Sequence, residues 1–126
     1  MSTGTMVEHL GIEFTYVDEG RIEAIMPVDQ RTKQPYGILH GGASLALAET
    51  IGSVAAHASI DSAKFQSVGL EINANHIRSV KGGSVKGVAV PVHLGKSTHV
   101  WAITITDQDD KLVCTSRITM AIIEKR

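Results

Sequence analysis

Residues 35–53, PYGILHGGASLALAETIGS, predict one long and largely apolar helix that the rest of the chain must cover. A histidine and two glycines precede the helical part, which is predicted to run over residues 41–58. A single carboxylate, Glu49, lies among the alanines and leucines of this helix. Because the other residues around it are apolar or small, the rest of the chain is expected to supply a large apolar surface.

Most of the remaining chain alternates apolar and polar side chains, as strands do. Residues 12–18 and 22–28 are predicted to form a hairpin, and residues 29–39 form a loop before the helix. Four further strands are predicted over residues 67–79, 84–93, 98–106 and 111–123, with turns at 82–83, 93–95 and 107–110. Two strands, one helix and four strands predict an α+β fold, in which an antiparallel sheet covers the helix.

The composition is that of one ordinary globular domain over residues 1–126, with 43% hydrophobic and 20% charged residues. A net charge of −1 argues against nucleic acid as a partner. No apolar run approaches the ~20 residues of a membrane span, and the N-terminus lacks a basic region followed by an apolar one. We therefore expect neither membrane insertion nor secretion. The single cysteine, Cys114, fits a reducing, cytoplasmic location.

Six histidines raise the question of a metal centre: His9, His40, His57, His76, His93 and His99. Only His93 and His99 are close in sequence, and their segment HLGKSTH has neither an HExxH pattern nor a carboxylate. We therefore expect no metal site, and no pattern indicates another cofactor.

The predicted helix has two different faces at 100° per residue. The face predicted to pack against the sheet carries Leu47, Ala48, Ile51, Val54, Ala55 and Ala58. The opposite face carries Glu49, Thr50, Ser53 and His57, with Ala46 and Ala56 beside them. Two interpretations of the polar face stay open, a solvent-exposed face or a site at a subunit interface. A single charge among small neighbours is more typical of an interface.

Gly41 and Gly42 place backbone N–H groups at the helix N-terminus, where the dipole is positive and no intrahelical acceptor is available. Such N–H groups stabilise an oxygen that gains negative charge in a reaction. The alternative role of these glycines is a turn with positive φ. Together with Glu49 two turns later, and with the Ser53 hydroxyl one turn beyond it to hold water, they predict a hydrolytic site.

The segment HGGASLALAE, residues 40–49, resembles the signature of the hotdog-fold acyl-CoA thioesterases whose catalytic carboxylate lies on the central helix. Residues 26–55, 68–80 and 91–101 are similar to the enzymes that hydrolyse 1,4-dihydroxy-2-naphthoyl-CoA in menaquinone biosynthesis. The proofreading thioesterases of enterobactin synthesis are a close sister group, and the phenylacetate-pathway thioesterases are more distant. The resemblance implies a hotdog fold, with an antiparallel sheet around one central helix.

The resemblance also implies a role for each residue of the predicted site. Glu49 stands at the position of the nucleophile or general base, and the Gly41 N–H at the position that polarises the thioester carbonyl. Gln34 and His40 match residues that orient the thioester and the water, and Ser53 matches a position that helps to hold the water. In the family these sites cross a dimer interface, and two dimers usually form a tetramer.

Coenzyme A binding is implied by the same resemblance for three parts of the chain: Gly69; His76, Ile77, Arg78 and Ser79; and His93, Leu94, Gly95, Lys96, Ser97 and Thr98. Gly69 would leave room for pantetheine, while Arg78 and Lys96 would reach phosphate oxygens. The alternative is that these are ordinary sheet-edge and turn residues. His57, His99 and Arg117 are weaker candidates for the same site.

The predicted reaction converts an acyl-CoA and water to a free acid and CoA, without a cofactor. An aromatic acyl group is expected, with 1,4-dihydroxy-2-naphthoyl favoured. Two alternatives remain. One is a hotdog enoyl-thioester hydratase or dehydratase, which typically uses an aspartate and histidine pair that is not evident here. The other is a non-catalytic acyl-CoA-binding module, which would have no need of Glu49.

Overall fold

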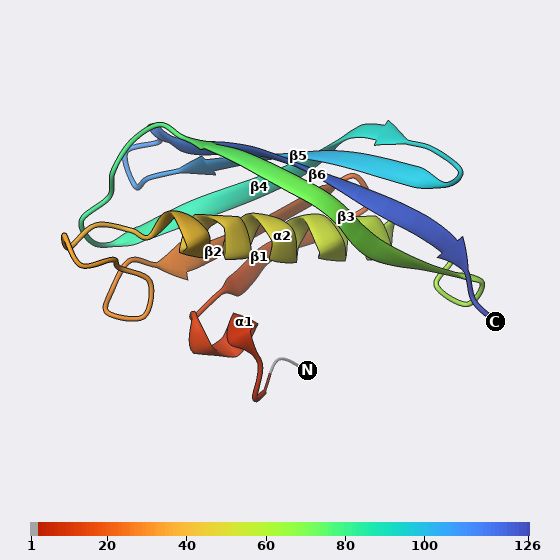
Figure 1. Ribbon diagram of the computed structural model, residues 1–126, viewed down its shortest axis with the longest axis horizontal. Coiled ribbons are helices and arrows are strands. Elements are labelled where there is room, and N and C mark those ends of the chain that lie inside the picture. The colour runs from red at the N-terminus through yellow and green to blue at the C-terminus, as the bar shows by residue number, and fades with distance from the viewer. Residues whose placement is uncertain (1–2) are drawn as a thin grey trace.

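The computed structural model describes residues 3–126, in which one antiparallel sheet wraps around one long helix (Figure 1). The elements in chain order are α1 (Met6–His9), β1 (Glu13–Asp18), β2 (Arg21–Pro27), α2 (Gly41–Ala58), β3 (Phe65–His76), β4 (Ser84–Leu94), β5 (Thr98–Thr106) and β6 (Leu112–Glu124). The strand order is β1-β2-β4-β5-β6-β3, so β1 and β3 are the edges of the sheet. The prediction of an α+β fold is confirmed.

Most predicted bounds lie within two residues of the observed ones, and α2 and β5 have the bounds that were predicted. β3 ends three residues early, at His76, because the N–H groups of Ile77 and Arg78 both bond to the Val113 carbonyl and the regular ladder stops there. β4 continues through Leu94, so the turn predicted at 93–95 begins later. The short helix α1 was not predicted, because four residues show no periodicity.

The buried face of α2 is rotated from the predicted one. Its buried residues are Ala43, Ser44, Leu47, Ala48, Ile51, Gly52, Ala55 and Ala56. The prediction was therefore wrong for Ala56, which is fully buried, for Val54, which is half-buried, and for Ala58, which is exposed. The reason is close packing at Gly52, where a Cβ atom would lie 2.7 Å from Cγ2 of Ile118 on β6. The helix approaches β6 along its smallest residues, which turns Val54 away from the sheet.

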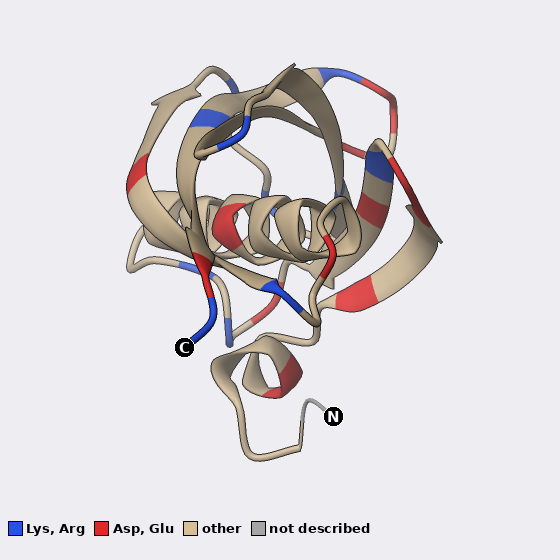
Figure 2. Ribbon diagram, turned by 90° about the vertical axis from the view of Figure 1, so that its right-hand side faces the viewer, with Lys and Arg blue, Asp and Glu red and all other residues tan. Residues whose placement is uncertain are grey.

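The edge strand β3 carries exposed apolar side chains, with Val68 42% and Leu70 61% exposed. Its register shifts between Gly69 and Glu71, where β3 pairs with β6. On the side of α2 away from the sheet lies α1, so α2 is enclosed by the sheet and α1 (Figures 1 and 2). Among the helices of residues 3–126, none has the length and hydropathy needed to cross a membrane.

Candidate active site

The N-terminus of α2 is capped by His40, which has extended backbone angles. Its Nδ1 atom accepts a hydrogen bond of 2.7 Å from the Gly42 N–H. A ring nitrogen that accepts is unprotonated, so the neutral ring carries its proton on Nε2, where it can be donated. Neither Gly41 nor Gly42 has a positive φ, so the alternative role of these glycines as a positive-φ turn is wrong.

Gly41 lies in close contact with the ring of His76 from β3. A Cβ atom at Gly41 would be 2.9 Å from His76 Nε2, so only glycine fits beside this ring without a shift. Within residues 3–126, the Gly41 N–H donates no hydrogen bond. The backbone N–H at the positive end of α2 is therefore available to a ligand.

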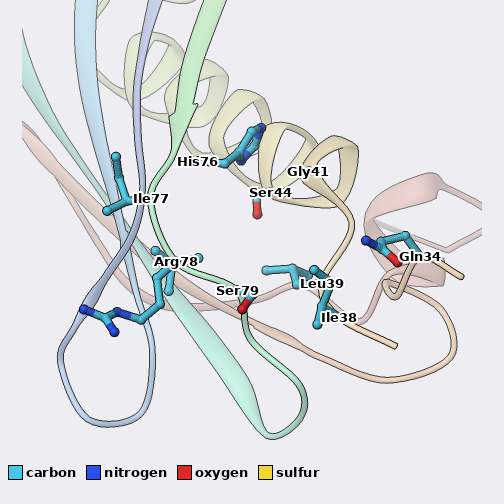
Figure 3. A pocket seen from close by; sticks show the side chains of 10 residues that line it. Gln34, Ile38, Leu39, Gly41, Ser44, His76, Ile77, Arg78 and Ser79 are labelled. Carbon is cyan, nitrogen blue, oxygen red and sulfur yellow. The ribbon is translucent and has the colours of Figure 1, made fainter. Parts of the chain in front are cut away.

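A cavity of about 310 Å³ lies against this helix terminus, and we call it the Gln34 cavity (Figure 3). Gln34, Gly41, Ser44 and the four residues His76–Ser79 are among those that line it. The Gln34 side-chain oxygen accepts a hydrogen bond from the Tyr36 N–H, so its amide nitrogen remains as a donor. In Figure 3 this nitrogen lies on the side of the cavity. The structure thus brings Gln34, Gly41 and His76 together.

Glu49 lies elsewhere, exposed on α2 beside the edge strand β3. It is the only charged residue in Gly41–Ala58 (Figure 2), and a Cβ atom at Gly69 would lie 3.5 Å from its Oε2. A second cavity of about 400 Å³, the Glu49 cavity, is lined by Glu49, Thr50 and Ser53 on one side. Its other walls are aliphatic or methionine side chains. Glu49 and Ser53 therefore share one apolar cavity, with Gly69 beside the carboxylate.

The two halves of the predicted site do not meet within one chain. Gly41 and Glu49 are eight residues apart, which is about 12 Å along a helix axis at ~1.5 Å per residue. Backbone N–H groups also point toward the N-terminus, so the Gly41 N–H points away from Glu49. One chain cannot offer both groups to a single thioester carbonyl.

The residues implied in coenzyme A binding also lie at opposite ends of α2. Arg78 is exposed at the rim of the Gln34 cavity, with its guanidinium directed away from Ser44 (Figure 3). Lys96 lines a cavity of about 290 Å³ together with Ser59 and Asp61, beyond the C-terminus of α2. Because α2 is about 27 Å long at ~1.5 Å per residue, one chain does not bring Arg78 and Lys96 together.

Three weaker candidates have different positions. His99 is buried on β5, and its Nδ1 accepts a hydrogen bond of 3.4 Å from Trp101 Nε1. Burial, and to a smaller extent the charge of His93, lowers the pKa of His99. His57 and Arg117 are exposed. None of the three lines the Gln34 cavity or the Glu49 cavity.

Sequence reasoning missed the part of the Glu49 cavity that comes from the N-terminal segment. Met6, Val7 and Leu10 line this cavity from α1 and its C-cap. A signal for α1 is present in the sequence, since Thr5 and Glu8 have the spacing of a capping box. The Thr5 side chain does accept a hydrogen bond from the Glu8 N–H, at 3.3 Å.

Across residues 3–126, no three His, Cys, Asp or Glu side chains are grouped so that they could hold a metal ion.

Comparison with known proteins identifies the family. The model of the thioesterase superfamily matches residues 36–114. The chain is 52% identical to the 1,4-dihydroxy-2-naphthoyl-CoA hydrolase of Escherichia coli, over 98% of this chain and 90% of the relative. It is 50% identical to the proofreading thioesterase EntH of Cronobacter turicensis, over 97% and 88%. A mutant thioesterase from Pseudomonas aeruginosa has a similar crystal structure, with a TM-score of 0.96, 44% identity and coverage of 98% and 89%. The chain therefore belongs to the thioesterase superfamily, and it is a thioester hydrolase with the hotdog fold.

Proposed function

We propose that this thioester hydrolase acts on aromatic acyl-CoA, with 1,4-dihydroxy-2-naphthoyl-CoA as the favoured substrate in menaquinone biosynthesis. The resemblance of residues 26–55 and 68–80 supports the substrate class, as does the relative that carries this name. The observation that carries the proposal is the position of Glu49. The one charged side chain of α2 opens onto an apolar cavity, where it can reach a thioester whose acyl group fills that cavity.

The donors at the start of α2 would polarise the thioester carbonyl. The Gly41 N–H has no acceptor within residues 3–126, and the Gln34 amide nitrogen is a second donor at the same cavity. The His40 ring lines a neighbouring cavity, where its Nε2–H would be a further donor. Hydrogen bonds from these groups would stabilise the negative charge that develops on the carbonyl oxygen.

Glu49 would act in one of two ways. As a general base, it takes a proton from a water molecule near Ser53, and this water attacks the carbonyl carbon. The C–S bond then breaks, and the CoA thiolate takes up the proton. As a nucleophile, Glu49 attacks the same carbon and expels CoA, which forms a mixed anhydride that water cleaves. Either route consumes one water and yields one acid and one CoA.

A complete site would need two copies of the chain. Within one chain the Gly41 N–H points away from Glu49. Gly41 lies beside His76 and Glu49 beside Gly69, and both of these neighbours belong to the edge strand β3. An exposed edge with apolar Val68 and Leu70 is suited to pairing with a second copy. We infer a dimer in which Glu49 and Ser53 of one subunit face the Gln34 cavity of its partner, and a tetramer built from two such dimers.

Arg78 and Lys96 would then hold coenzyme A from different subunits, because they lie at opposite ends of α2 in one chain. Arg78 would bind phosphate oxygens as a planar fork, and Lys96 as a mobile charge in the turn at residues 95–97.

Replacement of Glu49 by glutamine tests the proposal. Glu49→Gln keeps the shape but removes the proton acceptor, so kcat should fall by about 10²- to 10⁴-fold, as for loss of a general base. The measurement is CoA release, followed with a thiol reagent over a panel of aromatic and aliphatic acyl-CoA substrates. Glu13→Gln, at an exposed position on β1, is the matched control and should keep the parent rate.

Each alternative has its own outcome in this experiment. A Glu49→Gln protein within a few-fold of the parent rate would contradict the role of Glu49. A parent protein that binds acyl-CoA but releases no CoA would indicate a binding module. Loss of the oligomer together with activity would assign Glu49 a structural role.

A further inference from the structure

We propose that α1 is an adjustable wall of the acyl-binding pocket, and that Met6 on α1 determines which acyl groups are accepted. This inference rests on the proposed function of Glu49. It concerns Met6, Val7 and Leu10, which line the Glu49 cavity opposite α2.

The chemistry of the Glu49 cavity fits an uncharged and largely apolar group. Its polar residues, Glu49, Thr50 and Ser53, all come from α2. The Thr50 hydroxyl is already used, since it donates a hydrogen bond of 2.6 Å to the Ala46 carbonyl. The volume of about 400 Å³ lies within the ~300–1,000 Å³ that is usual for small-molecule pockets. An acyl group bound here would place its thioester carbonyl beside Glu49.

The two walls of this cavity differ in how firmly they are held. The α2 wall belongs to a helix whose other side is buried against the sheet. No residue of α1 is buried, and Met6 is 63% exposed. Val7 packs against the core while staying partly exposed, and the following Leu10, 6% exposed, holds the segment at its C-cap. A bulky acyl group would therefore displace α1 rather than α2.

The surroundings of Met6 also allow such a movement. Met6 itself has a flexible side chain that adapts to ligands of different shape. Met6 and Leu10 also line a neighbouring cavity of about 340 Å³ beside His40, so space exists on both sides of α1.

Because α2 carries the reacting carboxylate and is held by the sheet, the α1 wall determines which acyl groups fit the cavity. A larger side chain at Met6 would narrow the pocket for a bicyclic aromatic group and leave a small acyl group unaffected. A change of one methylene group in a hydrophobic pocket alters kcat/KM by about 10- to 200-fold.

The test compares Met6→Trp, Met6→Ala and the parent on acetyl-, benzoyl- and 2-naphthoyl-CoA. We expect Met6→Trp to lower kcat/KM for 2-naphthoyl-CoA at least about tenfold relative to acetyl-CoA. Met6→Ala should raise kcat/KM for 2-naphthoyl-CoA relative to acetyl-CoA. Val92→Trp, at an exposed position on β4, is the control and should leave the ratio unchanged. A ratio that stays constant in both Met6 variants, or an equal loss for all three substrates, would overturn the proposal.

A binding measurement separates this inference from the proposed function. The probe is a non-hydrolysable 2-naphthoylmethyl thioether of CoA, with CoA alone as the reference, and titration calorimetry gives both dissociation constants. Met6→Trp should weaken thioether binding at least about tenfold and leave the Kd of CoA unchanged. This result would support the role of α1 even if the parent protein released no CoA. Absence of CoA release would contradict the proposed function but not the role of α1. Equal thioether affinity in variant and parent would overturn the α1 wall, whatever the hydrolytic activity.

Discussion

Arg78 lies at the rim of the Gln34 cavity, and its guanidinium extends away from the donors at the start of α2 (Figure 3). It is near Asp107, whose pKa is lowered mainly by a backbone hydrogen bond from Lys111 and in smaller part by the charge of Arg78. A cation in this position can bind a phosphate oxygen without touching the reacting carbonyl.

Arg78→Ala should therefore raise KM for acyl-CoA about tenfold or more while kcat changes much less. Steady-state kinetics on benzoyl-CoA provides the measurement. Benzoyl-pantetheine, which lacks the nucleotide, is the control substrate and should not respond to the substitution. An equal effect on both substrates would show that Arg78 has a different role.

His99 provides a second test at the level of single residues. It is 3% exposed, and burial followed by the charge of His93 lowers its pKa. Below about pH 6.5 the unfolded chain binds a proton at this residue that the folded chain does not. The free energy of unfolding should thus decrease as the pH falls from about 6.5 to the lowered pKa, by up to about 1.4 kcal/mol per pH unit.

Urea unfolding at about pH 7.5 and about pH 5.5 measures this dependence. His99→Gln should lose less stability on acidification than the parent. His9→Gln, at an exposed position on α1, should lose as much as the parent. The same loss in parent and His99→Gln would mean that other groups cause the pH dependence.

The bounds of α2 were predictable, and the packing around it was less so. The apolar run and the capping histidine specify where α2 begins and ends, since both signals are local. Periodicity alone could not orient the helix, because Gly52 and Ala56 carry little hydrophobic signal. Gly52 is buried against Ile118, a residue 66 positions away from it. Long-range contact of this kind is invisible in a local pattern.

The same reason explains which parts of the site could be predicted. Glu49 and Gly41 lie in one segment and were predicted from its chemistry, whereas the role of His40 was implied by the family resemblance. Two other features depend on segments that come together only in the folded chain. These are the contact of Gly41 with His76 and the position of α1 over the side of α2 near Glu49. The catalytic and binding roles of the residues named from the family resemblance remain predictions.

Gly52→Ala tests the close packing between α2 and β6. In an exposed helix this change would stabilise by up to about 1 kcal/mol. Here the new Cβ would lie 2.7 Å from Cγ2 of the buried, β-branched Ile118, and overpacking costs about 1–3 kcal/mol. We expect a net loss of about 1–2 kcal/mol in the free energy of unfolding, measured with urea. Gly82→Ala, where a Cβ meets nothing within 4 Å, should change it by less than about 0.5 kcal/mol. A gain of stability in Gly52→Ala would contradict the close packing.

In the whole molecule, the proposed site would need a second copy of the chain, because Gly41 and Glu49 are separated within one chain. Exposed Val68 and Leu70 on the edge strand β3 are the surface most suited to that contact. A monomer at micromolar concentration that is stable and active in sedimentation experiments would contradict the shared site.

A mixture of two defective variants tests the shared site directly. Glu49→Gln removes the carboxylate, and Gln34→Ala removes a donor from the Gln34 cavity, so each protein alone should have little activity. If each site takes Glu49 from one subunit and Gln34 from its partner, one of four random pairings restores an intact site. Co-expression of the two variants should then recover about a quarter of the parent kcat per site, because the second site of each mixed dimer carries both defects.

The Glu49→Gln, Gln34→Ala double variant, co-expressed with the parent, is the control. It should also give about a quarter of the parent kcat per site, since only pairs of parent subunits keep both groups in one site. Activity of the first mixture that never exceeds the average of its two components would place Glu49 and Gln34 in the same chain's site.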